Sequence, residues 1–386
     1  MRRLLTVAAL AALLLAGCAT RSAVEPPAPL VEFEPTVEVK RDWQRRAGGG
    51  DDKRYLRLAP LVADGAVYVG ERGGTVRAYE AGSGRPLWRQ DLEATLTSSP
   101  GWGAHLYIGA SDGTVVALAP DTGEEIWRAR VSSEVLAPPR EAGGVVVVRS
   151  GDGRLTGLDA REGRRLWVYD RTVPVLTLRG TSAPLLLGDW LLAGFDSGQL
   201  TALTLAEGGV LWELPLGVPR GRNELERMVD IDADPLVVGP LVFAASYQGR
   251  VGAIELESGR AVWARDISVH AGLATDARPR GPAVVGAVYV TDADDHLWAL
   301  DARTGETLWR QDELRGRRLS GPAVHGDYVV VGDYQGYLHW FAREDGRLVA
   351  RERADRRGVL AAPVVEGEYL YVHGRGGRLS AWRVGG

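Results

Sequence analysis

Residues 98–130 read SSPGWGAHLYIGASDGTVVALAPDTGEEIWRAR, and this stretch decides the fold. After a Pro come an apolar run, a Ser-Asp-Gly turn, the alternating segment Thr-Val-Val-Ala-Leu, an Asp-Thr-Gly turn and a short strand that ends on Trp127. Runs of β-branched residues separated by Gly turns predict successive hairpins, and therefore a small antiparallel sheet. Such a sheet cannot bury its own faces, and stacking several copies against one another solves that problem.

Copies of this stretch recur along most of the chain. A Trp ends each copy at intervals of 39 to 51 residues, and Val349 takes that place in the last interval. The markers are Trp43, Trp88, Trp127, Trp167, Trp212, Trp263 and Trp309. A period of about 40–50 residues fits the four-stranded blades of a β-propeller. An aromatic platform for a quinone or sugar is an alternative use of these side chains, but packing between blades better explains one Trp per repeat.

The two ends of the chain complement each other. The final copy stops at residues 381–386 (AWRVGG) after only three strands, whereas no strands of its own precede Trp43. We expect the Trp43 segment to supply the missing outer strand, because ring closure removes exposed sheet edges. The sequence thus predicts an all-β fold, an eight-bladed β-propeller of four-stranded antiparallel blades closed by the N-terminal strand. A seven-bladed ring is the main competitor.

The N-terminus has the pattern of an export signal. Met-Arg-Arg precedes the apolar run Leu4–Leu15, which is too short for a good membrane span, and Leu-Ala-Gly-Cys follows. That tetrapeptide resembles the bacterial lipoprotein lipobox, which implies acylation of Cys18; an ordinary secretion signal is the alternative. In the lipoprotein pattern, Ala19 favours the outer membrane, with the protein facing the periplasm. We expect a signal peptide over residues 1–17, the lipidated Cys18 and an extended Pro-rich tether over 18–39, and one propeller domain over 40–386.

The composition narrows the function classes. A net charge of −4 over 386 residues gives no basic field for nucleic acid, so no nucleic-acid partner is expected. Nearly all cations are arginines, which we interpret as compositional bias rather than phosphate binding. Cys18 is the only cysteine, so the mature chain has no disulfide and no cysteine-based site. The six histidines form no Ser-His-Asp or His-Glu-x-x-His arrangement, and we expect no enzyme, no cofactor and no metal.

Three consecutive connectors between blades are longer than the others. From the terminal Trp to the Pro that opens the next blade, the distance is 17 residues after Trp167, 23 after Trp212 and 19 after Trp263, against 12 after Trp88, 11 after Trp127 and 13 after Trp309. Each joins an outer strand to the next inner strand, so we expect all three on one face of the disc, in one sector. Insertions on one face of a repeat protein often form its binding face.

The first two of these connectors carry the candidate binding residues. The first loop (residues 171–183, RTVPVLTLRGTSA) places Leu176 and Leu178 beside Arg179, as an interface anchor would, although both leucines could equally pack inward. The second loop (residues 218–234, VPRGRNELERMVDIDAD) has alternating acids that could be solvated or bind a cation. A calcium loop would want more ligands in a tighter frame, followed by Gly rather than Pro. The acidic turn at residues 292–295 is a similarly incomplete match.

Three segments resemble the BamB family, lipoproteins of the outer-membrane β-barrel assembly machinery: residues 176–184 (LTLRGTSAP), 221–232 (GRNELERMVDID) and 331–340 (VGDYQGYLHW). The resemblance covers most of the chain and implies an eight-bladed propeller of pyrroloquinoline-quinone-like repeats. It also implies a non-enzymatic scaffold that binds the periplasmic POTRA domains of BamA, the central barrel-assembly protein, and assists insertion of outer-membrane proteins. The family's contact residues, carried over to this sequence, are Leu176, Leu178, Arg179, Asp230 and Asp232.

Further functions stay open beside this one. The scaffold could also receive unfolded outer-membrane proteins by pairing with strand edges. A generic periplasmic propeller could instead bind a peptide or sugar in its central channel, and nothing in the sequence excludes that. A quinone-dependent dehydrogenase shares the repeat type, but such enzymes have vicinal cysteines and a calcium site beside a catalytic Asp, and the sequence offers no cysteine pair and no convincing calcium site.

Overall fold

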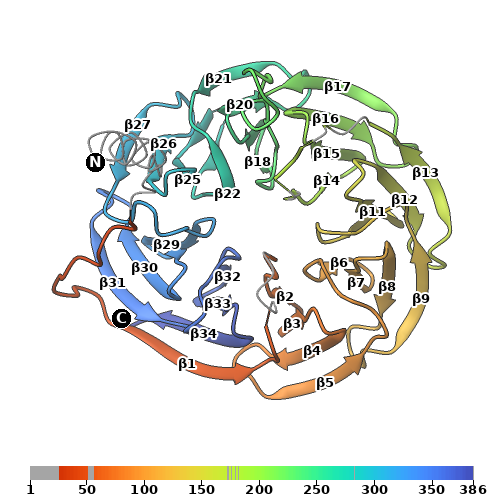
Figure 1. Cartoon of the computed structure of the whole chain (residues 1–386), viewed down its shortest axis with the longest axis horizontal. Coiled ribbons are helices and arrows are strands. Elements are labelled where there is room, and N and C mark those ends of the chain that lie inside the picture. The colour runs from red at the N-terminus through yellow and green to blue at the C-terminus, as the bar shows by residue number, and fades with distance from the viewer. Residues whose placement is uncertain are drawn as a thin grey trace, which may run out of the picture.

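The computed structural model describes residues 26–50, 56–171, 174, 176–178, 180, 182–281 and 283–385. Eight four-stranded antiparallel sheets stand as blades around a central axis (Figure 1). Within the described residues there is no helix, and therefore none that is long and apolar enough to cross a membrane. The predicted eight-bladed propeller is confirmed, and a seven-bladed ring is wrong.

Each blade is built outward from an inner strand beside the central axis to an outer strand at the rim. In that order, blades 1 to 4 consist of β2 (Leu61–Ala63), β3 (Ala66–Gly70), β4 (Thr75–Glu80) and β5 (Pro86–Asp91); β6 (Gly101–Trp102), β7 (Leu106–Gly109), β8 (Thr114–Leu118) and β9 (Glu125–Arg130); β10 (Arg140–Ala142), β11 (Val145–Arg149), β12 (Leu155–Asp159) and β13 (Arg165–Tyr169); and β14 (Leu185–Leu187), β15 (Trp190–Gly194), β16 (Gln199–Thr204) and β17 (Val210–Pro215). Blades 5 to 8 consist of β18 (Leu236–Val238), β19 (Leu241–Ala245), β20 (Val251–Glu255) and β21 (Ala261–Arg265); β22 (Val269–Thr275), β25 (Ala287–Asp292), β26 (Leu297–Asp301) and β27 (Thr307–Gln311); β28 (Ala323–His325), β29 (Tyr328–Gly332), β30 (Tyr337–Ala342) and β31 (Leu348–Arg353); and β32 (Val364–Glu366), β33 (Tyr369–His373), β34 (Arg378–Val384) and β1 (Val39–Arg46). The hairpin of β23 (Arg278–Arg280) and β24 (Ala283–Val285) is an addition to blade 6.

The ring closes through the N-terminal strand, as predicted. β1 pairs antiparallel with β34, from Val39 opposite Val384 to Arg46 opposite Arg378. This closure also explains why Val349 stands where the other blades have Trp. Blade 8 is made from both ends of the chain, so it has no turn between its third and outer strands that could receive an indole.

The Trp residues fasten each outer strand to the following blade. Each indole N–H donates to a backbone carbonyl of the next blade over 2.6–3.0 Å, as Trp127 does to Ala160 at 2.9 Å. The ring lies against a Gly of that blade, and a Cβ at Gly163 would come within 2.6 Å of Trp127. Gly163 also has a φ of 69°, which other residues rarely adopt. The interpretation of these seven Trp side chains as packing residues is confirmed.

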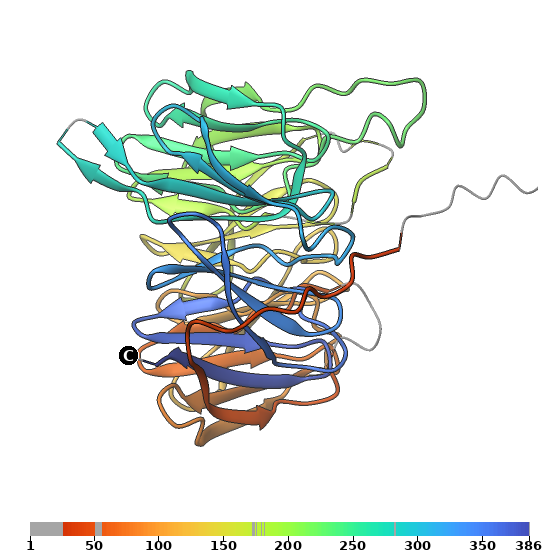
Figure 2. The same cartoon turned by 90° about the vertical axis from the view of Figure 1, so that its left-hand side faces the viewer.

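The expectation for the third long connector is wrong. β21 ends at Arg265 and the inner strand β22 already begins at Val269, ahead of the Pro that marked the blade start in the sequence. Val269 and Leu273 are buried and their strand pairs with β25, which makes this segment the inner strand. The additional residues form the β23–β24 hairpin instead. It projects from the opposite face of the disc, to the left in Figure 2.

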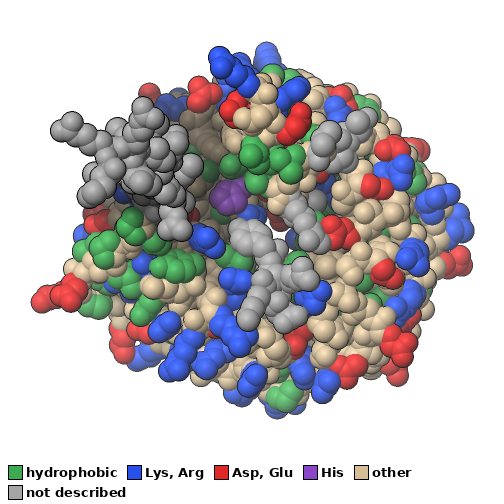
Figure 3. Space-filling view, in the orientation of Figure 1, with side chains coloured by type: hydrophobic (Ala, Val, Ile, Leu, Met, Phe, Trp, Pro, Cys, Tyr) green, Lys and Arg blue, Asp and Glu red, His purple; other side chains and the backbone are tan. Residues whose placement is uncertain are grey.

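Part of the predicted tether packs on the propeller. Residues 26–38 cross blade 7 before β1 begins, and they reach blade 7 on the face that Figure 3 views. Leu30 and Phe33 pack against buried side chains of blades 6 and 7. Arg351 holds this segment through a 2.9 Å hydrogen bond to the Val31 carbonyl and lies 5.1 Å from the Phe33 ring centre. The domain boundary at residue 40 stays a prediction.

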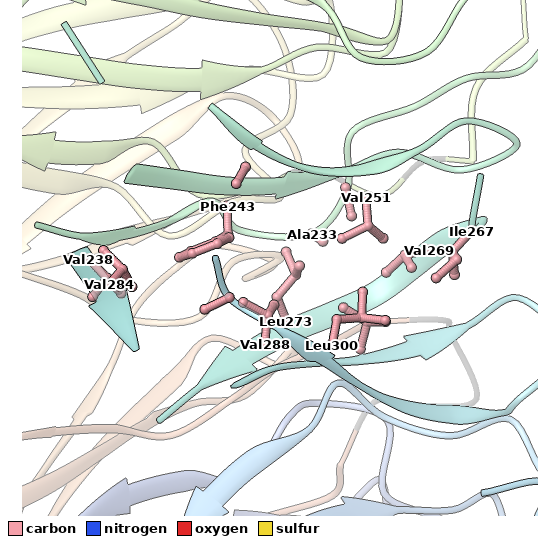
Figure 4. Close-up of a cluster of buried hydrophobic side chains, with 14 residues drawn as sticks. Ala233, Val238, Phe243, Val251, Ile267, Val269, Leu273, Val284, Val288 and Leu300 are labelled. Carbon is pink, nitrogen blue, oxygen red and sulfur yellow. The ribbon is translucent and has the colours of Figure 1, made fainter. Parts of the chain in front are cut away.

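The core lies between blades rather than within them. Second strands such as β19 are buried almost throughout, because neighbouring blades cover both faces. Figure 4 shows one such layer, in which Phe243 and Val251 of blade 5 meet Val288 and Leu300 of blade 6. The strands therefore form a closed, packed ring that carries the connectors at its faces.

Candidate functional site

The first and second loops rise from the same face of the disc. The first joins β13 to β14 and the second joins β17 to β18, and both project to the right in Figure 2. Other connectors on this face are shorter, for example residues 92–100 and 131–139. The two longest connectors on this face, residues 170–184 and 216–235, therefore lie in one sector, formed by blades 3, 4 and 5, while residues 47–60 between blades 8 and 1 are nearly as long as the first.

Carboxylates of the second loop hold the backbone of the first. The Asp230 carboxylate accepts a short hydrogen bond from the N–H of Leu178, and Asp234 Oδ1 accepts one from the N–H of Ala183 at 2.6 Å. Gly180 lies so close to Asp232 that a Cβ there would come within 2.4 Å of the carboxyl carbon. The shape of the first loop therefore depends on a segment about 50 residues later in the sequence.

Burial governs the protonation of these carboxyl groups. Asp230 is fully buried and Asp232 is 5% exposed. Loss of water contact raises the pKa of Asp230 to about 6 and the pKa of Asp232 to about 7, and it also raises the pKa of Asp234. Neither carboxylate oxygen of Asp232 accepts a hydrogen bond within the part of the chain that the structure describes. The Asp230 and Asp232 carboxyl groups therefore change protonation close to neutral pH.

A buried ion pair lies beneath the first loop. Arg149 of β11 donates to Asp196 Oδ1 at 2.5 Å and to Ser182 Oγ at 3.1 Å. Its guanidinium also lies over the Phe195 ring, 5.5 Å from the ring centre. Because Ser182 is near the end of the first loop, these contacts tie the loop to blades 3 and 4. Arg149 was not among the predicted site residues, since a long-range pair leaves no local pattern.

The loops leave apolar side chains in solvent. Leu176 is 37% exposed, Val218 is 55% exposed and Leu225 is 63% exposed, while Leu178 is half-buried. A cluster of exposed large apolar residues on protruding loops is typical of a protein-binding surface. We call Leu176, Leu178, Val218 and Leu225 the apolar loop surface.

Local hydrogen bonds shape the tip of the second loop around Leu225. The N–H of Glu226 donates to Asn223 Oδ1 at 2.9 Å, and the Asn223 amide donates back to Glu226 Oε1 at 2.8 Å. Gln248 of blade 5 donates to the Leu225 carbonyl at 3.2 Å. The tip is thus held by polar contacts, and the Leu225 side chain remains exposed to solvent.

Of the five predicted partner residues, the structure places four together. Leu176 and Leu178 lie on the first loop, and Asp230 and Asp232 lie directly beneath it. The aspartates face inward, however, so in this structure they position the loop rather than form its outer surface. Arg179 and Cys18 lie outside the described residues. Val218 and Leu225 were not predicted, although an isolated Leu within a charged loop was a usable signal.

The acidic segments are not arranged for a metal. Within the described ranges, no group of three or more His, Cys, Asp or Glu side chains could hold a metal ion. At the turn in blade 6, Asp292 accepts hydrogen bonds from His296 and Trp298, both at 2.8 Å. Asp295 accepts the N–H groups of Arg318 and Leu319. These carboxylates are therefore engaged in packing the blade.

The central channel contains a cavity of about 440 Å³ beside the two loops. Its walls include Arg57, Arg140, Asp232 and Asp234 together with apolar residues of the inner strands and connectors. A cavity of this size and mixed character can take a small ligand.

Comparison with known proteins identifies the family. The family model described as "Outer membrane protein assembly factor BamB" matches residues 40–103, 72–311 and 293–384. The chain is 45% identical to the protein of that name from Alkalilimnicola ehrlichii, with 98% of this chain and 96% of the relative covered. It is 42% identical to the one from Pseudomonas aeruginosa, with 98% of each covered.

Solved structures agree with this match. The crystal structure of BamB from Moraxella catarrhalis superposes with a TM-score of 0.80 at 26% identity, over 90% of this chain and 100% of that one. The quinohemoprotein alcohol dehydrogenase of Comamonas testosteroni gives a TM-score of 0.67 at 15% identity, over 89% of this chain and 76% of that one, and it therefore shares only the fold. Given the family match along the propeller and the close relatives over nearly the whole length, the chain belongs to the BamB family of outer membrane protein assembly factors.

Proposed function

We propose that this protein is a non-enzymatic scaffold of the outer-membrane β-barrel assembly machinery, and that it binds the periplasmic POTRA domains of BamA. Family membership supports the assembly role. The choice of surface rests on one observation, which is that two loops of one sector meet through buried carboxylates and leave leucines exposed. Apolar anchors beside charged side chains supply affinity and orientation in protein interfaces.

The roles within the site differ between residues. Leu176 and Leu178 contact the partner, and Arg179 adds a charge-assisted hydrogen bond. Asp230 and Asp232 hold the first loop in its binding shape from below. The other barrel-assembly components would then join through BamA, and unfolded outer-membrane proteins would approach the same assembly.

Co-purification with BamA tests the surface. In the double variant Leu176→Glu/Leu178→Glu, two charges replace the apolar anchors, and we expect recovery of BamA to fall by about tenfold or more. The matched control is Leu308→Glu, because Leu308 is 55% exposed on the outer strand β27 of blade 6. The control should bind BamA as the native chain does. Native recovery of BamA by the folded double variant would refute the site.

The N-terminal anchor is a second part of the proposal. Cys18 is the acylated residue, cleavage removes residues 1–17, and the lipid holds the propeller at the periplasmic side of the outer membrane. With Cys18→Ala, labelled palmitate should no longer be incorporated and the protein should leave the outer-membrane fraction. Unchanged palmitate labelling of that variant would exclude Cys18 as the attachment site.

The channel cavity favours one alternative, a propeller that binds a small peptide or sugar. A photo-crosslinking residue in place of Leu176 separates the two functions in intact cells. Under the scaffold proposal it captures BamA. If the crosslinked product contains no barrel-assembly protein, the result would contradict the scaffold proposal and favour a propeller that binds a peptide or sugar in its channel.

A further inference from the structure

Six exposed arginines lie on the loop face away from the apolar loop surface. They belong to blades 7 and 8 and to the connectors at their edges, where Figure 3 shows Lys and Arg side chains gathered at the lower left. We call them the arginine arc: Arg46, Arg318, Arg353, Arg356, Arg357 and Arg378. Within the described residues none of the six forms an ion pair with a carboxylate, whereas nine other exposed arginines do.

Hydrogen bonds link the segments that carry several of these arginines. Gln335 links the connector before blade 7 to Arg353, since it accepts from Arg317 at 2.6 Å and its carbonyl accepts from Arg353 at 3.3 Å. Asp355 links the next connector to blade 8, because it accepts the N–H of Arg357 at 2.8 Å and that of Gly376 at 3.0 Å. The segments that carry the arginines are therefore neighbours along the edge of the ring.

The structure concentrates positive charge here at a cost. Arg46 and Arg378 stand directly opposite each other on β1 and β34, a like-charge pairing that destabilises a sheet. Two described carboxylates beneath the arc are turned inward, whereas Glu352, next to Arg353, and Glu313, on the connector that carries Arg318, are exposed. Asp333 is buried against Arg317, and Asp355 accepts backbone N–H groups. Because the chain as a whole has a net charge of −4, the arc is a local feature and not part of a generally basic surface.

The N-terminal segment arrives beside this arc. The Ala28 N–H donates to the Arg315 carbonyl at 2.9 Å, and Arg317 donates to the Ala28 carbonyl at 3.0 Å. Only residues 19–27 separate this point from Cys18, and nine residues reach at most about 30 Å. An acyl chain on Cys18 would therefore keep the arc close to the leaflet that holds it.

We propose that the arginine arc docks on the headgroups of anionic phospholipids in the leaflet that holds the lipid anchor. The proposal rests on the acylation of Cys18 for its location, but the binding itself belongs to the folded ring. A basic patch adds electrostatic attraction to an anionic membrane surface, beside whatever affinity the lipid supplies. Arginines near an anionic surface contribute about fivefold each in affinity. Docking would fix the orientation of the ring relative to the membrane. The apolar loop surface, on the other side of the same face, would remain available to the partner protein.

Vesicle binding by the chain without its anchor tests this directly. The protein from residue 19 onwards keeps every described residue, and Asp51 and Asp52, which lie outside them, remain in place. With vesicles of phosphatidylethanolamine and phosphatidylglycerol at about 3:1 and low salt, we expect the protein to co-sediment. It should not do so with vesicles that lack phosphatidylglycerol, and about 0.3 M salt should release it. Arg356→Glu/Arg357→Glu should lower binding by about tenfold or more, and neither native side chain has an ion pair to lose within the described residues.

The matched control is Arg164→Glu/Arg165→Glu, an adjacent exposed pair on blade 3 with the same change in charge. It should bind vesicles as the native chain does. Equal loss in both double variants, or no binding to the anionic vesicles at low salt, would overturn the proposal. Native vesicle binding by Arg356→Glu/Arg357→Glu together with loss of BamA would overturn it as well, and would reassign the arc to an acidic protein. Leu176→Glu/Leu178→Glu should lose BamA and keep vesicle binding, so the two proposals fail separately.

Discussion

Blades 2 and 4 have the same four strands and differ in the connector that leaves the outer strand. After β9 the chain crosses to blade 3 through residues 131–139, where Val135 is fully buried and its carbonyl accepts from Thr97 at 2.8 Å. After β17 the crossing takes residues 216–235, and Val218 and Leu225 remain exposed. The difference teaches that strands, turn glycines and short connectors build the ring, whereas the length added after blade 4 carries the exposed apolar side chains that we propose bind the partner.

The largest effect should come from the regular blade. Trp127→Ala removes a buried indole and its bond to Ala160, and it should lower the free energy of unfolding by about 3–5 kcal/mol. Urea unfolding measures this loss. BamA binding, measured where the variant is still folded, should not change. Ile126→Ala, on the exposed side of the same strand, is the control and should cost far less. A loss below about 1 kcal/mol for Trp127→Ala would show that the indole does not hold blade 2 to blade 3.

The next effect concerns pH and the buried carboxyls of the long-loop sector. Burial raises the pKa of Asp230 to about 6 and that of Asp232 to about 7, so the folded state holds these protons more tightly than the unfolded chain. Their stabilising contribution is complete below about pH 4 and is lost as pH rises through about 6 to 7. Asp230→Asn/Asp232→Asn should therefore be more stable than the native chain at about pH 8, by about 2–4 kcal/mol, and gain little at about pH 4.

Thermal or urea unfolding of both proteins from about pH 4 to about pH 8 checks this prediction. Only the difference in the free energy of unfolding between the two proteins is informative. Asp333 and other paired carboxyl groups have a lowered pKa, so their stabilising contribution is lost at low pH in both proteins. A difference that does not grow with pH would mean that the two acids are ionised in the folded state at neutral pH.

The contrast between the regular blades and the long connectors also separates the features that could be predicted from the sequence from those that could not. The blade number, the closing strand and the Trp contacts were predictable, since each depends on a residue type that recurs at a fixed place in the repeat. The third long connector was not predictable in this way, because the inner strand of blade 6 begins at Val269, well before the Pro that opens the strand in other blades. The inward orientation of the Asp230 side chain could not be predicted from the sequence either. It arises from a contact with Leu178, 52 residues away in the sequence, and no local pattern records that.

A smaller effect should come from removing one loop fastener. Asp230→Ala leaves the Leu178 N–H without its acceptor, and it should cost about 1–2 kcal/mol and weaken BamA binding although Asp230 is buried. Hydrogen exchange at the Leu178 amide should become faster. Asp230→Asn keeps an acceptor oxygen and should retain binding. If Asp230→Asn loses binding as fully as Asp230→Ala, then the charge of Asp230, and not its position under the loop, matters to the partner.

The smallest effect on stability should occur at the tip of the second loop, where Leu225 is 63% exposed. Leu225→Glu removes no buried contact, so the free energy of unfolding should change by less than about 0.5 kcal/mol. Because the side chain belongs to the apolar loop surface, BamA affinity should nevertheless fall by about fivefold. Leu211→Glu is the control on the outer strand of the same blade, 44% exposed, and it should leave both quantities unchanged. If Leu225→Glu binds BamA as Leu211→Glu does, then the partner surface ends at the first loop, and the additional length of the second loop serves to hold the first in place.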